Sequence, residues 1–132
     1  MRARDALGRP VSEGDLSAVE PVGEQALPAE QALALAQRLL TAGRAFSAHE
    51  VLEASWKAAP ADERASWQGL AQICVGVTHL QRGNLVGAAR LLRRGAATAP
   101  ADVAAQALAL AGQVDDGRTD SPVLRLPAAV RP

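Results

Sequence analysis

The sequence predicts an all-α fold: a single-domain antiparallel bundle of about five helices with loose N- and C-terminal tails. Hydrophobic residues make up 48% of the 132 residues but aromatic residues only 2%, so Ala and Leu must fill the interior. This composition favours close-packed helices over sheets, because β-branched and aromatic side chains are scarce. The helical spacing of the apolar residues places the bundle in residues 27–112, between an arm at 1–26 and a tail at 113–132.

The charge balance and the lack of targeting signals narrow the classes of function. Fourteen basic and fourteen acidic residues give a net charge of zero, which argues against a nucleic-acid or anionic-membrane partner. The single cysteine, Cys74, excludes an internal disulfide and fits a reducing compartment. No apolar run approaches the roughly 18 residues of a membrane span, and no signal-peptide core opens the chain. We therefore expect a cytoplasmic protein without membrane contact, and leave a protein partner or self-association open.

The N-terminal arm and the first helix are distinguished by composition. Residues 1–26 are rich in Gly, Pro, Glu and Ser and show no helical or strand period. This composition fits either a disordered tail or an extended arm that lies on the domain. The first helix is expected to run from Pro28, a residue suited to the first helical position, to Gly43, which is a good C-terminal stop.

The second helix is expected to begin at Ser47. Ser47-x-x-Glu50 has the pattern of a capping box, and Phe46 and Val51 fit the hydrophobic staple on either side of it. Pro60 should end this helix, because the residue before a proline is biased away from helical conformation.

Three more helices are expected in the rest of the domain. The third, over about 62–82 with Asp62 as its cap, is apolar nearly all round, which predicts the buried centre of the bundle. Its small residues at positions 65, 69 and 76 should let another helix approach closely, and the second helix is one candidate. Asn84 should cap a fourth helix through Gly95, and a fifth should run over about 100–111.

An internal echo relates the two halves of the domain by 40 positions. It places Gly43, Ala48, Leu52, Ala59 and Pro60 over Gly83, Ala88, Leu92, Ala99 and Pro100. Two helix-turn-helix units of this length resemble a short helical-repeat array, although chance remains an explanation in so Ala-rich a chain. The second copy has Ala and Arg where the first has His49 and Glu53, so helix packing alone does not require that polar pair.

The most informative stretch is the face of the second helix. At about 100° per residue, His49, Leu52, Glu53 and Trp56 fall on one arc that carries the aliphatic and aromatic bulk, so this arc should face the interior. Burying a histidine and a carboxylate without partners would cost several kcal/mol. The pair must therefore be hydrogen-bonded, ion-paired or bound to a metal.

Two hypotheses follow for this pair. In the first, His49 and Glu53 bind one divalent ion of the zinc or manganese class, with His79 of the third helix as a further ligand, and the metal activates water for hydrolysis. In the second, the same residues form a structural network in a non-catalytic helical-hairpin interaction module. Whether the protein is an enzyme stays open. The residues expected to support either site are Glu50, Trp56, Trp67, Gln68 and Gln72.

Three motifs carry a resemblance to a known family: Ala48-His49-Glu50-x-x-Glu53-x-x-Trp56-Lys57, Trp67-Gln68-Gly69-Leu70-Ala71-Gln72, and Val75-Gly76-x-Thr78-His79-x-x-Arg82-Gly83-Asn84. Over roughly residues 30–98 the chain is similar to the domain of unknown function family 309. The resemblance implies a small all-α fold of about five helices and a suspected metal site at His49 and Glu53, without an established activity. The opening Arg4-Asp5-x-x-Gly8-Arg9-Pro10 resembles the lead-in of one branch of that family, which favours an ordered arm. After Asp116 the chain departs from longer relatives.

Overall fold

The computed structural model describes residues 3–12, 14–23 and 25–131 and contains five α-helices. These are α1 (Ala29–Thr41), α2 (Ala45–Ala58), α3 (Arg64–Gln81), α4 (Leu85–Ala96) and α5 (Ala101–Asp115). The only β-pairing in the described ranges is two isolated bridges within the arm, so the all-helical prediction is confirmed. Residues 1, 2, 13 and 24 of the predicted arm and residue 132 of the predicted tail lie outside the described residues. None of the five helices is long and apolar enough to cross a membrane.

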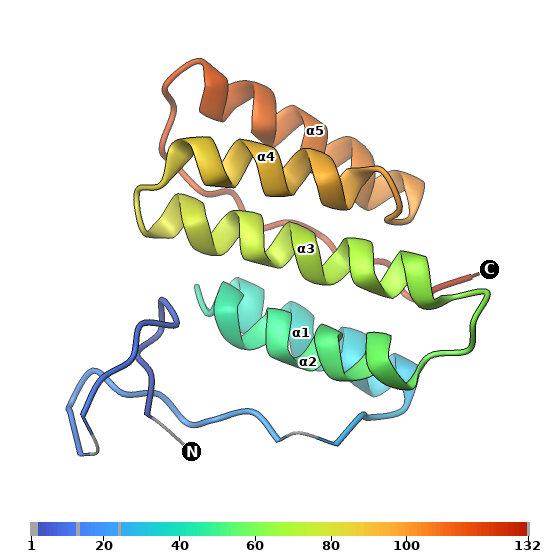
Figure 1. Ribbon diagram of the computed structural model, residues 1–132, viewed down its shortest axis with the longest axis horizontal. Helices are drawn as coiled ribbons and strands as arrows, with labels where there is room; N and C mark the ends of the chain where they lie inside the picture. Colours follow the sequence, from blue (N-terminus) through green and yellow to red (C-terminus); the bar gives the residue numbers. More distant parts are fainter. Residues whose placement is uncertain (1–2, 13, 24, 132) are drawn as a thin grey trace.

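The helices form two layers (Figure 1). In one layer α2, α3 and α4 lie side by side, while α1 packs behind α2 and α5 behind α4. Each helix thus packs mainly against its neighbours in the chain. Residues 118–131, which we call the C-terminal segment, pass behind α3 between α1 and α5. This segment occupies the place in the second layer that a sixth helix would take.

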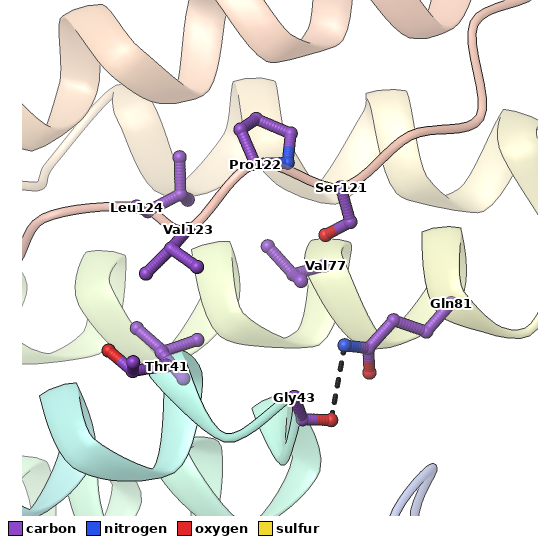
Figure 2. Close-up of a pocket in the computed structure, with 9 residues that line it drawn as sticks. Thr41, Gly43, Val77, Gln81, Ser121, Pro122, Val123 and Leu124 are labelled. Atoms are coloured by element: carbon purple, nitrogen blue, oxygen red, sulfur yellow. Dashed lines mark hydrogen bonds between the residues drawn. The ribbon is translucent and has the colours of Figure 1, made fainter.

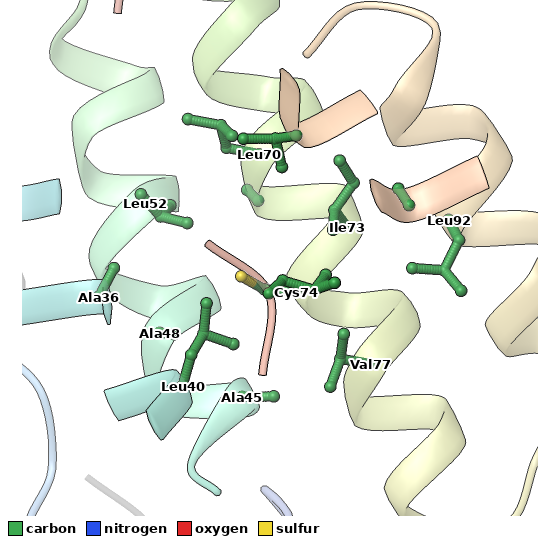
Figure 3. Close-up of a cluster of buried hydrophobic side chains, with 14 of the residues drawn as sticks. Ala36, Leu40, Ala45, Ala48, Leu52, Leu70, Ile73, Cys74, Val77 and Leu92 are labelled. Carbon is green, nitrogen blue, oxygen red and sulfur yellow. The ribbon is translucent and has the colours of Figure 1, made fainter. Parts of the chain in front are cut away.

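The core lies between α2 and α3 and continues to α4 (Figure 3). Its largest fully buried side chains include Leu52 of α2, Leu70 and Ile73 of α3, and Leu92 of α4. Cys74 is buried in the same layer, and this burial raises the pKa of its thiol to about 12. The prediction that the third helix forms the centre of the domain is therefore confirmed.

The small residues of α3 face α4 rather than α2. A Cβ atom built on Gly69 would lie 2.7 Å from the carbonyl oxygen of Gly95, and one on Gly95 would lie 2.6 Å from the carbonyl oxygen of Gly69. A Cβ on Gly76 would lie 2.9 Å from Leu92 Cγ. A helix thus approaches these glycines closely, as expected, but it is α4 and not α2, since larger side chains such as Leu70 and Cys74 fill the α2–α3 interface.

The capping box expected at the start of the second helix does not form. The chain turns at Gly43, with φ of +77°, and the helix begins at once: the Ala48 amide donates to the carbonyl oxygen of Arg44 at 3.0 Å. Ser47 therefore lies inside the helix, and its hydroxyl accepts from Arg44 Nη2 at 3.1 Å. Glu50 is consequently free of the capping role assigned to it.

The other helix ends lie closer to the positions predicted from the sequence. Asn84 caps α4 as predicted, with its side-chain oxygen accepting from the Gly87 amide at 3.0 Å. At the start of α3 the cap position is Glu63 rather than Asp62, without a side-chain cap bond. The last helix continues past Gly112 to Asp115, where an ion pair between Asp115 and Arg93 ties it to α4.

Candidate functional site

The site residues predicted in the second helix lie along the edge of the buried face of α2. The buried residues at the centre of that face are Ala45, Ser47, Ala48, Val51, Leu52 and Ser55. His49 and Glu53 flank this centre, with 18% and 37% of their side chains exposed, and Trp56 is half-buried. Of the arc predicted to face the interior, only Leu52 is fully buried, because small side chains make up most of the contact face. We call His49, Glu50 and Glu53 the His49 patch.

Three side chains of α2 interact in a row along the helix: His49 and Glu53 of the His49 patch, and Lys57. His49 Nε2 lies 2.9 Å from Glu53 Oε2, and Lys57 Nζ lies 3.1 Å from Glu53 Oε1. Burial alone would raise the pKa of Glu53, but the hydrogen bond from Lys57 and the charges of His49 and Lys57 outweigh it and lower the pKa. An ionised carboxylate only accepts hydrogen bonds, so His49 Nε2 carries the proton that is donated to Glu53. His49 Nδ1 is buried and has no hydrogen-bond partner among the residues described.

The second histidine is not part of the His49 patch. His79 Nδ1 lies 3.2 Å from Asn84 Nδ2, and the oxygen of the same amide already caps α4. The amide nitrogen is therefore the donor and His79 Nδ1 the acceptor, which requires a neutral imidazole. Burial lowers the pKa of His79, and the positive charges of Arg82 and Arg90 lower it further. In the ranges that the structure describes, no group of three or more His, Cys, Asp or Glu side chains is placed to hold a metal ion.

The two tryptophans differ in burial. Trp67 of α3 is only 2% exposed, and its indole N–H donates to Glu63 Oε1 at 3.4 Å. Trp56 packs against the core from its margin. Trp56, which was predicted to face the interior, thus lies at the margin of the core, and the buried tryptophan is Trp67. Gln68 and Gln72 of α3 are half-buried, and the bond that His49 makes is to Glu53 rather than to Gln72.

The N-terminal arm covers the side of α2 that carries the His49 patch. The arm is anchored on Phe46, whose ring centroid lies 5.4 Å from that of His49. The guanidinium carbon of Arg4 lies 5.0 Å from the Phe46 ring centroid, and that of Arg82 lies 5.9 Å from it. Arg82 Nε also donates to the carbonyl oxygen of Leu7 at 2.8 Å. Residues 4–8 of the arm therefore lie against α2 and the C-terminal end of α3.

A tight turn brings the arm against the ring. Asp5 is buried and accepts hydrogen bonds from the amides of Leu7 and Arg9 at 3.0 and 2.9 Å. Gly8 has φ of +79°, and a Cβ atom built there would lie 2.2 Å from Phe46 Cγ. Only a glycine fits this position, since both the backbone conformation and the contact exclude a side chain. Gly8-Arg9-Pro10 after Asp5 is a turn signal in the sequence, but the sequence gives no signal for its contact with Phe46, which lies far along the chain.

Glu50 lies where the arm meets α2. Burial raises the pKa of Glu50, although the charges of His49, Arg4 and Arg44 act in the opposite direction. The pKa of its neighbour Glu53 is lowered, so two carboxyl groups one turn apart have opposite tendencies. Such a pair could take up and release a proton. The patch does not, however, gather the three ligands predicted for a metal centre.

Comparison with known proteins finds a family match for the central part of the chain. Residues 33–91 match the model of a family described as Domain of unknown function (DUF309), which supports the resemblance seen in the motifs. The matched stretch runs from α1 into α4 and contains the His49 patch; the arm, α5 and the C-terminal segment lie outside it. No curated protein and no solved structure matched the chain.

Proposed function

We propose, on the premise that residues 33–91 belong to this family of unknown function, that the protein is a non-catalytic interaction module built from helical hairpins. The observation that supports the proposal is the packing order. Each helix packs mainly against its chain neighbours, as in helical-repeat proteins, and the glycines that end α1 and α3 have φ of +77° and +82° at positions 40 residues apart. Arrays of this kind leave broad faces that bind extended partners.

In this proposal the His49 patch is a structural network. Glu53 uses both carboxylate oxygens within its own helix, one for His49 and one for Lys57. The imidazole in turn packs against Phe46, the residue that anchors the arm. The network thus holds the arm-binding side of α2 in one arrangement, and no reacting group is required.

Metal binding by His49 and Glu53, with a hydrolytic activity derived from it, is the alternative hypothesis for this pair. His49 Nε2 and Glu53 Oε2 are close enough to bind one ion in place of their proton. A zinc ion held by a protein takes at least three protein ligands, whereas His79 is engaged by Asn84 and flanked by two arginines. The residues present do not fit a three-ligand site, so we assign no reaction step to a metal.

Titration calorimetry of chelator-stripped protein with zinc, manganese and nickel tests the proposal. We expect no binding heat and an unchanged melting temperature with each ion. A metal site would release protons on binding and, at a free-ion concentration one hundred times Kd, would stabilise the fold by about 2.7 kcal/mol. Saturable binding that His49→Ala and Glu53→Ala both abolish would overturn the structural interpretation.

A double-mutant cycle provides the positive evidence. In metal-free protein, His49→Ala and Glu53→Ala should couple by about 0.5 kcal/mol, because the pair is partly exposed. The control combines His79→Ala with Glu53→Ala. These two effects should add, because His79 makes its contacts elsewhere. Equal behaviour of the two cycles would show that the His49–Glu53 bond contributes nothing to the fold.

A further inference from the structure

The C-terminal segment is held as an extended strand by two glutamine side chains. Gln37 of α1 donates from Nε2 to the carbonyl oxygen of Leu124 at 3.0 Å, and its Oε1 accepts from the Leu126 amide at 2.8 Å. Gln106 of α5 makes two hydrogen bonds to Arg125: Nε2 donates to the carbonyl oxygen at 3.0 Å, and Oε1 accepts from the amide at 2.8 Å. Each side-chain amide thus acts as the backbone of a neighbouring strand would.

The two glutamines form hydrogen bonds to opposite edges of the strand. In extended backbone, the N–H and C=O groups of successive residues point alternately to the two edges. Gln37 bonds residues 124 and 126 on one edge, and Gln106 bonds residue 125 on the other. These four bonds use only backbone atoms of the strand. They select an extended conformation without selecting a sequence.

Selection by side chain comes from the face turned toward α3. Leu124 is 4% exposed and belongs to the hydrophobic core, Leu126 and Val130 pack against it, and Arg125 points to solvent. Beside Leu124, a hollow of about 190 Å³ lies between the segment, Val77 and Gln81 of α3, and the end of α1 (Figure 2). Val123 borders this hollow and is 47% exposed, so the segment leaves part of the groove unfilled.

We propose that the groove between α1 and α5 is a binding site for extended peptides of other proteins, and that the C-terminal segment is its internal competitor. The ligand class is a peptide with two aliphatic residues at alternate positions followed by proline, as in Leu124-Arg125-Leu126-Pro127. This inference rests on the proposed function, because it names the face through which the interaction module acts. The partner peptide displaces residues 118–131 and takes over the four glutamine bonds.

The internal competitor sets the affinity that a partner must reach. A tethered segment acts at an effective concentration of about 1 mM. If the free peptide binds the empty groove with Kd of about 10 μM, the tether weakens its apparent affinity about a hundredfold. Emptying the groove should therefore strengthen peptide binding by about that factor.

The test uses a fluorescent peptide of residues 119–131 and the full chain carrying Leu124→Asp, which places a charge in the buried position and releases the segment. We expect saturable binding to this variant and binding about a hundredfold weaker to the wild type. Ala129→Asp is the matched control, since that side chain is exposed and the segment should stay in place. If Leu124→Asp unfolds the chain, Leu124→Ala replaces it. No binding to a variant that circular dichroism shows to be helical overturns the proposal.

Two further measurements test the hydrogen bonds from Gln37 and Gln106 to the bound peptide. In the Leu124→Asp chain, Gln37→Ala should weaken peptide binding about tenfold, because two hydrogen bonds are lost, whereas Gln31→Ala on the exposed side of α1 should not. A peptide N-methylated at the residue corresponding to Arg125 should also bind weakly, and one methylated at exposed Ala129 normally. Equal affinities across either comparison would overturn recognition through the backbone.

The outcomes also separate this proposal from the one on which it rests. A wild-type dimer that Leu124→Asp dissociates would show that a second copy's segment occupies the groove, and would overturn the claim of a foreign peptide. A zinc-binding signal at His49 would overturn the structural network but would not change peptide binding. Absence of peptide binding would overturn the groove and leave the double-mutant cycle unchanged.

Discussion

Replacing Gly8 by alanine should detach the N-terminal arm from α2. Gly8 has φ of +79°, a conformation that costs an alanine about 1 to 2 kcal/mol, and its added Cβ atom would lie 2.2 Å from the Phe46 ring. The ring cannot turn away freely, because Arg4 and Arg82 lie over it at 5.0 and 5.9 Å. The arm must therefore move instead.

The contacts of the arm limit the loss of stability. The cation–π contact of Arg4 with Phe46 contributes about 0.5 to 1 kcal/mol, and the hydrogen bond from Arg82 to Leu7 contributes about 1.5 to 3 kcal/mol because its donor is charged. Once the arm has left, these contacts are lost and the strain at residue 8 is relieved. We therefore expect Gly8→Ala to reduce the free energy of unfolding by about 2 to 4 kcal/mol.

Gly14→Ala is the matched control. Gly14 has nearly the same φ, +82°, but a Cβ atom there would meet nothing within 4 Å, so it should lose only the conformational term of about 1 to 2 kcal/mol. Urea denaturation measures both losses. Hydrogen exchange at the Arg82 Nε–H group, which donates to the Leu7 carbonyl oxygen at 2.8 Å, reports directly on arm opening. Its protection should fall roughly thirtyfold or more in Gly8→Ala. Equal stability losses and equal exchange in the two variants would refute the packing of Gly8 on Phe46.

The helix contacts and the carboxyl groups of α2 lead to two more predictions. Gly95→Ala should destabilise the fold by about 1 to 2 kcal/mol, because its Cβ atom would lie 2.6 Å from the backbone of Gly69. Gly112→Ala, with open space around it, should stabilise the fold by up to about 1 kcal/mol. Denaturant melts in which both variants shifted stability in the same direction would contradict the close α3–α4 approach. The raised pKa of Glu50 means that this residue contributes stability at pH values below its pKa in the unfolded chain and loses that contribution as pH rises through its pKa in the folded protein. Glu50→Gln should therefore gain stability relative to the wild type as pH rises above 4.5. Glu53→Gln should show the opposite trend: its loss of stability should be greatest at neutral pH and should decrease as pH falls through the lowered pKa of Glu53. Parallel pH profiles of the two variants would contradict both expectations.

Local sequence signals were sufficient for most of the helices. Positive-φ glycines stop α1 and α3 where the sequence placed them, and the Asn84 cap opens α4 as expected, because each depends on backbone conformation and on groups within one turn. The same local reasoning failed at Ser47. There the capping-box pattern was present, but a helix can begin two residues earlier when the turn at Gly43 is tight enough to continue directly into it.

For the polar residues on helix faces, the sequence predicted partners within the same helix but not partners in distant segments. His49 and Glu53 could be identified as a pair from their spacing, and they do bond each other. Gln37 and Gln106 give the same kind of signal, since each lies among the apolar residues of its own helix, yet their partners are about 87 and 19 residues away along the chain. Periodicity gives the face on which a side chain lies but not the segment opposite that face.

The sequence by itself thus determined the all-α class, the number and order of the helices and the central place of α3, because apolar periodicity and helix-end chemistry are properties of neighbouring residues. Only the tertiary structure decided that His79 belongs to the α4 cap rather than to His49, that the arm is anchored on Phe46, and that an extended segment lies between α1 and α5. The reason is physical: a hydrogen bond or a ring contact depends on which surfaces meet, and that is settled by the packing of all five helices together.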